Sequence, residues 1–302
     1  MINLNISSTK SLEKAISENH IKYINCDQLT ESEEIAKGAF GHIRKAVWKV
    51  HKKTVALKSL RTDVSSINTI EDFVKEIQLL QKLALGEHPN INSFYGISRD
   101  SCNEYSMVLE FASDGNLRQY LKINFSSLKW TDKFRMAKEI TLGLFFLHNN
   151  NIIHRDLHFE NILVNEGIMK IADFGLSTNL NEMSEAQCID YKNASYDCGM
   201  PAYIDPQYFE NPKYGFTKKS DIYSLGVILW EISSGKPPYQ SFTSIDAIAV
   251  YIFQGKRETP IEGTPQKYIN IYTECWDEDP HLRPDSMSVL KALDLFLINE
   301  IS

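Results

Sequence analysis

The sequence predicts an α+β protein, in which a small antiparallel sheet with one long helix comes first and a larger, mostly helical part follows. Two observations lead to this class. Between about residues 33 and 111, short apolar runs are separated by turn residues, and only one long stretch has helical spacing. From about residue 130 onward, apolar residues recur at intervals of three and four, which is the period of a helix. We therefore expect a sheet-rich small lobe and a helical large lobe.

Residues 1–29 are expected to form an N-terminal extension that braces the small lobe. Their apolar residues first have helical spacing and then alternate as in a strand. These residues are Leu12, Ala15 and Ile16 for a short helix, and Ile21, Tyr23 and Ile24 for a strand.

The small lobe is expected to contain a strand, a glycine-containing loop, two strands, the long helix and two further strands. The helix is predicted from about Ile70 to Leu85. Its apolar stripe contains one acid, Glu76, which should therefore point inward together with its neighbours. The residues that share this side are Phe73, Glu76, Ile77, Leu80 and Leu83.

The first helix of the large lobe is predicted to begin near Trp130, with Thr131 as its N-cap, and to end near Asn149. Its apolar residues lie three and four positions apart, so they should form one buried face. They are Phe134, Ala137, Ile140, Leu144 and Leu147.

Two later helices complete this prediction. One runs from about Lys219 to Ser233 and ends at Gly235, and it is apolar enough to be buried. The last begins at Pro284, because the first turn of a helix tolerates proline.

Composition excludes several classes of protein. A chain of 302 residues with 43% hydrophobic residues has room for one large or two small cores. The net charge of -7 argues against a nucleic-acid partner, because proteins that bind nucleic acid usually carry basic patches. The five cysteines include no Cys-x-x-Cys pair, so we expect neither a zinc site nor disulfides, and a cytoplasmic location fits best. No window approaches the ~18 apolar residues of a membrane span, so membrane insertion is not expected.

One run of residues carries the chemistry. Residues 154–161 read His-Arg-Asp-Leu-His-Phe-Glu-Asn, and Asp-Phe-Gly follows at residues 173–175. Such a run supplies a carboxylate that can accept a hydroxyl proton, and an amide oxygen and a second carboxylate that can hold Mg²⁺. These are the groups that a phosphoryl transferase needs.

Further motifs occur in matching order along the chain. Residues 36–43 have the form of a glycine-rich loop, and Val-Ala-Leu-Lys follows at residues 55–58. Residues 202–207, Ala-Tyr-Ile-Asp-Pro-Gln, resemble an Ala-Pro-Glu element, while Asp221, Trp230, Arg283 and Pro284 stand at familiar positions. With these motifs, roughly residues 30–297 resemble a protein kinase.

The resemblance implies a bilobal kinase domain over residues 30–298, with ATP and Mg²⁺ as cofactors and proteins as substrates. The N-lobe would cover residues 30–111, the hinge about residues 110–115 and the C-lobe residues 116–298. In the glycine-rich loop, Gly38 and Gly41 would let the backbone approach phosphate. The other implied nucleotide-binding residues are Ala36, Lys37, Ala39, Phe40, Ile43, Ala56, Leu109, Glu110, Ala112, Asn116 and Leu163.

Three of these residues have specific implied roles. Phe40 would shield the site from water, and Leu109 would be the gatekeeper before the backbone groups that bind adenine. Ala36 stands where the family usually has its first glycine, which is tolerable if its φ stays negative. Alone, this loop would be indistinguishable from a hairpin turn.

Lys58 follows three apolar residues on a strand, which is an unusual place for a charge unless an anionic group meets it. The resemblance implies an ion pair with Glu76 and contacts to the α- and β-phosphates. Glu71 is a competing partner, although it lies about half a turn from the inward stripe. An exposed strand lysine is the simpler alternative.

Within the catalytic loop, the resemblance makes Asp156 the acceptor of the substrate hydroxyl proton and makes Asn161 and Asp173 the ligands of Mg²⁺. His154 is expected to pack in a buried column with Phe174, Leu80 and Phe94. Arg155 is expected to bind a phosphorylated residue of the segment 184–196, unless that segment is only a polar surface loop. Such phosphorylation could occur between two transiently associated copies.

Three positions depart from the serine/threonine kinase pattern. His158 replaces a lysine that contacts the γ-phosphate, and a histidine is largely neutral at pH 7. Met200 stands where a threonine is frequent, and Gln207 replaces the glutamate that pairs with the arginine matched by Arg283. We therefore expect a less compensated Arg283 and a less stable C-lobe.

Tyrosine kinases place alanine and arginine residues in the catalytic loop, and residues 157–160, Leu-His-Phe-Glu, do not have that pattern. The resemblance is to the tyrosine-kinase-like group, especially its expanded fungal branches, whose members mostly phosphorylate serine or threonine. A role in intracellular signalling follows. The alternatives are a pseudokinase or ATP-binding scaffold, a kinase with tyrosine or dual acceptor preference, and a small-molecule kinase, against which the docking-loop motif at residues 200–207 argues.

Overall fold

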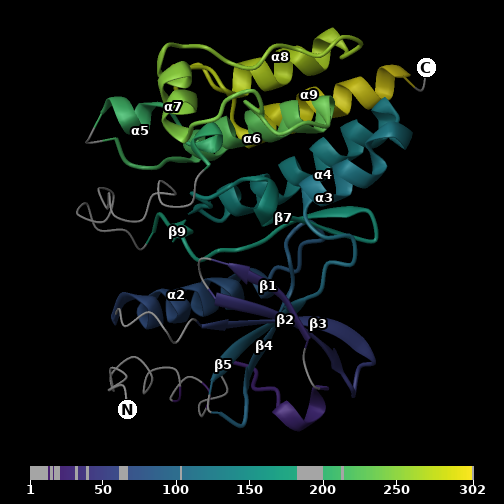
Figure 1. Ribbon diagram of the computed structural model, residues 1–302, viewed down its shortest axis with the longest axis vertical. Coiled ribbons are helices and arrows are strands. Elements are labelled where there is room, and N and C mark those ends of the chain that lie inside the picture. Colours follow the sequence, from purple (N-terminus) through teal and green to yellow (C-terminus); the bar gives the residue numbers. More distant parts are fainter. Residues whose placement is uncertain are drawn as a thin grey trace. The chain divides into compact units, whose positions relative to one another are not determined.

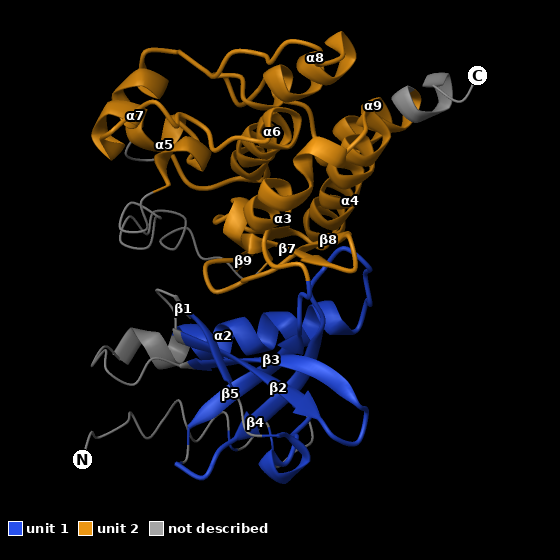
Figure 2. Cartoon of the chain, turned by 45° about the vertical axis from the view of Figure 1, so that its right-hand side comes forward, with its two compact units in different colours: residues 1–113 blue, residues 114–302 orange. Residues whose placement is uncertain are grey.

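The chain forms two compact units, residues 1–113 and residues 114–302, in the computed structural model (Figure 2). The structure describes residues 13, 16, 21–30, 33–38, 41–60, 67–102, 104–181, 200–211 and 214–300. The first unit contains a five-stranded sheet, and the second is mainly helical (Figure 1). The predicted α+β class is confirmed.

The first unit has its strands and helix in the predicted order. All neighbouring strands are antiparallel, and the spatial order in the sheet is β1-β2-β3-β5-β4. The elements are the 3-10 helix η1 (Cys26–Gln28), β1 (Glu33–Gly38), β2 (Gly41–Trp48), β3 (Lys53–Leu60), α2 (Ile67–Ala84), β4 (Phe94–Arg99) and β5 (Tyr105–Glu110).

The helix α2 begins three residues earlier than predicted and ends one residue earlier. Its inward stripe is confirmed, because every residue predicted to share that side is buried. The last predicted residue, Leu85, follows the helix and is 90% exposed.

The register of the sheet separates its two faces. Residues directly opposite each other on adjacent strands point to the same face. One face carries the buried cluster of Ile24, Leu29, Ala46, Trp48, Val55, Leu57 and Val108. Two members of this cluster, Ile24 and Leu29, come from the segment before β1, so that segment covers one face of the sheet.

The predicted bracing role of the segment before β1 is visible in its backbone contacts. The amide of Ile24 donates to the carbonyl of Ile97 at 2.8 Å, and the amide of Ile97 donates to the carbonyl of Lys22 at 2.9 Å. Gly96 adopts φ 142°, and a Cβ at this position would overlap the carbonyl oxygen of Lys22. The predicted strand is a single parallel bridge between Tyr23 and Ile97, and most of the predicted helix lies outside the described residues.

The second unit is built around helices α4 and α6. The helix α6 is buried from Ser220 to Ser234 and ends at Gly235, whose φ of 67° suits glycine. The elements of the second unit are α3 (Leu117–Asn124), η2 (Phe125–Ser127), α4 (Trp130–Asn149), β6 (Ile152–Ile153), η3 (Phe159–Asn161), β7 (Ile162–Asn165), β8 (Ile168–Ile171), β9 (Thr178–Asn179), η6 (Pro201–Tyr203), α5 (Gln207–Glu210), α6 (Lys218–Ser234), α7 (Ile245–Phe253), α8 (Gln266–Cys275) and α9 (Ser286–Glu300).

The predicted buried face of α4 is confirmed, because its five apolar residues are fully buried. The prediction that Thr131 is the N-cap of this helix is wrong. Thr131 lies inside the first turn, because the carboxylate of Asp132 accepts the backbone amide of Lys129 at 2.9 Å and makes Lys129 the cap.

The last helix begins later than predicted, at Ser286 instead of Pro284. The reason is again a side-chain bond. The carboxylate of Asp285 accepts the amide of Ser288 at 2.7 Å, which places the cap one residue after the proline. Among the residues described, no helix is both long and apolar enough to cross a membrane.

Candidate active site

The expected pair of Lys58 and Glu76 is present in the first unit. Lys58 Nζ lies 2.7 Å from Glu76 Oε1 and 3.0 Å from Oε2, and both residues are buried. The sheet places Lys58 inward, and the apolar stripe of α2 brings Glu76 to it. A buried ammonium group requires such a partner, because removing its hydration is costly. The side chain of the alternative partner, Glu71, lies outside the described residues.

The strand register gathers other predicted nucleotide-binding residues on the face that carries Lys58. Ile43 lies opposite Lys58, Ala36 lies opposite Ile43, and Ala56 lies opposite Leu109. These side chains therefore share one face, the reverse of the face covered by Ile24 and Leu29.

The loop between β1 and β2 is described only in part. Ala36 is not among the residues with positive φ, which meets the condition under which an alanine can replace the first glycine. Gly38 pairs with Gly41 across the hairpin. Ala39, Phe40 and the side chain of Lys37 lie outside the described residues.

The end of β5 is held by the backbone of the preceding loop. The amide of Glu110 donates to the carbonyl of Ser93 at 2.8 Å, and the hydroxyl of Ser93 donates to the Glu110 carboxylate at 3.0 Å. The Glu110 amide is thus engaged within the unit, whereas Ala112 is half-buried beyond the strand.

In the second unit, Asp221 fixes the backbone of the predicted catalytic loop. One carboxylate oxygen accepts the amide of His154 at 2.8 Å and the Nε2 of His148 at 2.9 Å, and the other accepts the amide of Arg155 at 2.9 Å. Arg155 has φ 71°, a conformation that side chains other than glycine adopt at a cost of about 1–3 kcal/mol. The bonds to Asp221 stabilise this conformation and so position Asp156, the next residue.

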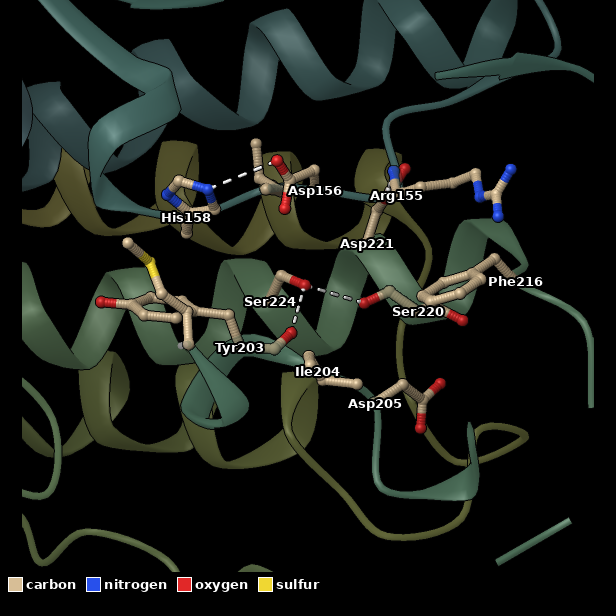
Figure 3. Close-up of a pocket in the computed structure, with 12 residues that line it drawn as sticks. Arg155, Asp156, His158, Tyr203, Ile204, Asp205, Phe216, Ser220, Asp221 and Ser224 are labelled. Carbon is tan, nitrogen blue, oxygen red and sulfur yellow. Dashed lines mark hydrogen bonds and ion pairs between the residues drawn. The ribbon is translucent and has the colours of Figure 1, made fainter. Parts of the chain in front are cut away.

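The loop after Arg155 brings Asp156, His158 and Asn161 together. Asn161 Nδ2 donates to the Asp156 carbonyl at 2.8 Å and to Asp156 Oδ2 at 3.1 Å. His158 Nε2 lies 3.4 Å from Asp156 Oδ2 (Figure 3). All three residues are buried, so water screens their interactions poorly.

The second predicted metal ligand, Asp173, follows a segment that is tied to Asn161. The amide of Ala172 donates to the carbonyl of Asn161 at 2.8 Å, so the two predicted ligands lie on hydrogen-bonded segments. Asp173 has φ 60°, another strained backbone position. Because the Asn161 amide nitrogen faces Asp156, its amide oxygen points elsewhere.

This donor set suits Mg²⁺, which proteins usually hold with one or two carboxylates while substrate phosphates and water supply the other ligands. In the part of the chain that the structure describes, no three His, Cys, Asp or Glu residues gather as a metal site. A magnesium site completed by phosphates does not require such a cluster.

His154 and Arg155 contact the segments next to this loop. The ring of His154 packs 5.4 Å from that of Phe174, as expected for two members of the predicted column, and its Nε2 lies 3.0 Å from the carbonyl of Ala172. Arg155 Nη1 donates to Thr178 Oγ1 at 3.1 Å, and its guanidinium lies over the ring of Phe216. The segment 182–199, with the predicted phosphorylation sites, lies outside the described residues.

The prediction that Gln207 leaves Arg283 poorly compensated is wrong. Asp205, two residues earlier, pairs with Arg283 through both oxygens, at 2.6 and 2.9 Å. Both side chains are fully buried. Gln207 instead donates to Glu210 at 2.8 Å on the surface. The expected loss of C-lobe stability therefore has no structural basis.

A second network that the sequence did not predict holds the segment after Met200. Tyr203 donates to Glu231 at 2.6 Å, and Arg118 donates to both Glu231 at 2.9 Å and Tyr203 at 3.1 Å. Burial raises the pKa of Glu231 despite the opposing Arg118 bonds, and burial raises the pKa of Tyr203 well above its ordinary value. Ser224 donates to the Tyr203 carbonyl at 2.7 Å, which attaches the segment to α6 (Figure 3).

Two further predicted nucleotide-binding residues lie together in the second unit. Asn116 and Leu163 form an antiparallel bridge. The side chain of Asn116 accepts the amide of Gln119 at 2.9 Å, and this cap begins α3.

Asp221 and Asp205 had a signal in the sequence. Each is an acid inside a predicted buried or apolar segment, where a carboxylate requires a partner.

Comparison with known proteins gives a family match over most of the chain. Residues 29–293 match the family described as "Protein tyrosine and serine/threonine kinase". This confirms the resemblance drawn from the motifs.

Among curated proteins, the chain is similar to the probable serine/threonine-protein kinase drkA of Dictyostelium discoideum, with 31% identity over 90% of the chain and 40% of that protein. It is 31% identical to the serine/threonine/tyrosine-protein kinase HT1 of Arabidopsis thaliana, over 89% of the chain and 66% of that protein. It is 34% identical to the serine/threonine-protein kinase VIK of Arabidopsis thaliana, over 86% of the chain and 58% of that protein. The match to drkA and to its relative drkB spans about two fifths of their length.

Proposed function

Since the chain belongs to the protein tyrosine and serine/threonine kinase family, we propose that it transfers the γ-phosphoryl group of ATP to serine or threonine hydroxyls of proteins. The observation that carries this proposal is the buried pair of Lys58 and Glu76. Active kinases require this pair in place, because it positions the lysine for the nucleotide phosphates.

The first unit would bind the nucleotide. Lys58 would contact the α- and β-phosphates, and the backbone at Gly38 and Gly41 would contact phosphate oxygens. The carbonyl of Glu110 and the backbone of Ala112 would bond adenine beside the gatekeeper Leu109. The remaining residues of this unit proposed to contact the nucleotide are Ala36, Lys37, Ala39, Phe40, Ile43 and Ala56. Asn116 and Leu163, of the second unit, are proposed to contact it as well.

The second unit would supply the chemistry. Asp156 would orient the substrate hydroxyl and accept its proton, and Asn161 and Asp173 would hold Mg²⁺ by their side-chain oxygens. The bound ion would neutralise charge on the phosphates. The hydrogen bonds from Asn161 to Asp156 support this division of roles, because they fix the proton acceptor next to a metal ligand.

A scaffold without catalysis is the competing function, and the departures at His158 and Met200 are its support. Gln207 no longer supports it, because Asp205 compensates Arg283. Acceptor preference is a separate question, since one similar protein is named a serine/threonine/tyrosine kinase.

We further propose that residues 30–298 are the catalytic domain after an extension of residues 1–29, and that the kinase acts on signalling proteins in the cytoplasm. Phosphorylation within residues 184–196, by a second copy in transient association, would dock that segment on Arg155 and raise activity.

The test is a Mg²⁺-ATP assay of the purified chain with a mixture of protein substrates, read by phosphosite mass spectrometry beside the Asp156→Asn variant. We expect phosphoserine or phosphothreonine with the parent and at least ~100-fold less with the variant. Phosphotyrosine alone would overturn the acceptor class. If neither protein transfers phosphate although ATP binds, the scaffold function takes the place of this proposal.

A further inference from the structure

We infer that His158 is a positioning residue that holds Asp156 through a fixed Nε2–H tautomer, and that it does not replace the phosphate-contacting lysine of other kinases. The inference deepens the proposed function and rests on it for its kinetic part. Its structural part rests on the contacts around the imidazole ring.

The first contact decides which ring nitrogen carries the proton. The backbone amide of Glu160 donates to His158 Nδ1 at 3.2 Å, so His158 is the N-cap of η3. A ring nitrogen that accepts a hydrogen bond uses its lone pair and carries no hydrogen. The proton of the neutral ring is therefore on Nε2.

The second contact shows where that proton points. Asn161 Nδ2 lies 3.1 Å from His158 Nε2, but the two hydrogens of this amide are directed to the carbonyl and to Oδ2 of Asp156. The contact between the two nitrogens thus contains no hydrogen bond from Asn161. Oδ2 of Asp156, at 3.4 Å, is the anionic atom that Nε2–H faces.

The surroundings restrict the ring to this orientation. The ring of His158 has those of Phe159 and Tyr203 at 5.9 and 6.1 Å, and only 6% of the residue is exposed. Because His158 and Asn161 both contact Oδ2, they define the orientation of the Asp156 carboxylate. Orientation matters for a proton acceptor, since a misplacement of about 1 Å can cost ~100-fold in rate.

A lysine cannot take over both contacts. Its ammonium has three donors and no acceptor, so a lysine at position 158 would lose the bond from the Glu160 amide. His158 therefore makes a pair of contacts that a lysine at the same position could not make.

Two amide substitutions separate the two ring nitrogens. In His158→Asn, the amide oxygen can replace Nδ1 as acceptor, but the shorter side chain brings no donor of its own to Asp156. In His158→Gln, the longer amide can bring a donor toward Asp156 but the cap of η3 is lost. We expect both to lower kcat, His158→Asn by about tenfold more than His158→Gln, with KM for ATP within about twofold of the parent. We expect the opposite order in thermal stability, because only His158→Gln loses the cap.

The exposed His281 provides the matched control, and His281→Asn should leave kcat and stability as they are. A purely structural role of His158 predicts that kcat follows stability, with His158→Gln the worse enzyme, and that result would overturn the inference. So would a His158→Lys variant with kcat at or above the parent, because it would show that charge on the phosphate is what position 158 supplies.

Nitrogen NMR of histidine-labelled protein tests the tautomer without activity. The His158 signals are assigned by their loss in His158→Asn, with His281→Asn as the control for assignment. We expect an unprotonated Nδ1 and a protonated Nε2, and the reverse pattern contradicts the structural part. If the parent transfers no phosphate at all, the proposed function and the positioning role fail together, while the tautomer is still decided by the spectrum.

Discussion

Two buried ion pairs of this protein have similar geometry and different meaning. In the first unit, Lys58 meets both oxygens of Glu76, and in the second unit Arg283 meets both oxygens of Asp205. The difference lies in the parts of the chain that each pair joins. The other N–H groups of Arg283 go to three backbone carbonyls, so the five donors of its guanidinium have five acceptors. These acceptors are Asp205 Oδ1 and Oδ2 and the carbonyls of Lys219, Asp277 and Glu278.

A saturated guanidinium joins segments of the chain and has no donor left for a ligand. The ammonium of Lys58 meets the carboxylate of Glu76 on α2, so this pair joins β3 to that helix. Burial and charge complementarity alone thus do not reveal whether an ion pair serves catalysis or folding.

The largest expected effect separates activity from stability at the first pair. Lys58→Met should lower kcat/KM by about 10²- to 10³-fold, because a donor to the phosphates is lost. It should also destabilise the unit, since Glu76 remains buried without its cation.

The double variant Lys58→Met/Glu76→Leu should regain most of that stability and none of the activity, because an apolar pair of similar size is tolerated where an unpaired charge is not. Thermal unfolding and steady-state kinetics measure the two effects. A double variant that regained activity would show that the pair is structural, like the second one.

The second pair should affect stability most. Asp205→Asn leaves Arg283 with a neutral partner in a buried site, so we expect the free energy of unfolding to fall by about 3–5 kcal/mol. Gln207→Glu is the matched control, because its side chain lies near Glu210 on the surface and should change stability by less than about 1 kcal/mol. Urea unfolding compares them. A larger loss for Gln207→Glu than for Asp205→Asn would contradict the assignment of the partner.

The smallest effect concerns an exposed carboxylate, which sharpens the contrast with Asp205. The amide of Ser288 holds the pKa of Asp285 below its ordinary value. The folded state therefore gains stability from this group above the ordinary value near 3.9, and loses it as the pH falls through the lowered pKa.

Accordingly, Asp285→Ala should reduce the free energy of unfolding by about 1 kcal/mol at pH 7, and the difference from the parent should shrink as the pH falls below the ordinary pKa of an aspartate. Asp285→Asn keeps an acceptor for the Ser288 amide and should show a smaller difference with little pH dependence. Urea unfolding at pH 7 and at acidic pH measures the free energy of unfolding of each variant. A difference that grows on acidification would rule out the capping bond as its source.

The sequence was a good guide where one local period decides the structure. Glu76 was placed correctly because a helix repeats every 3.6 residues and the apolar stripe around it is unambiguous. The residues of the proposed catalytic loop are predicted from order and spacing like those of kinases, and their roles stay predictions. The cap at Thr131 and the helix start at Pro284 are wrong because they rest on residue type alone, whereas the carboxylates of Asp132 and Asp285 accept the backbone amides that decide where the helices begin.

Contacts between distant residues were the least predictable. Asp205 and Arg283 are 78 positions apart, and Asp221 is 66 positions from Arg155. The family pattern directed attention to Gln207, because it fixes positions along the chain and not the direction in which a nearby acid can point. Only folding brings the alternative acid to the arginine.

The backbone hydrogen bonds between the segment before β1 and Ile97 protect one edge of the sheet from pairing with other molecules. β4 is one of the two edge strands of the five-stranded sheet, and edge strands with unpaired amides and carbonyls recruit strands from other molecules. The segment at residues 22–24 occupies part of that border. A fragment cut at residue 29, where the family match begins, would remove this cover together with the buried Ile24. Such a fragment would be complete in its catalytic motifs and prone to aggregate.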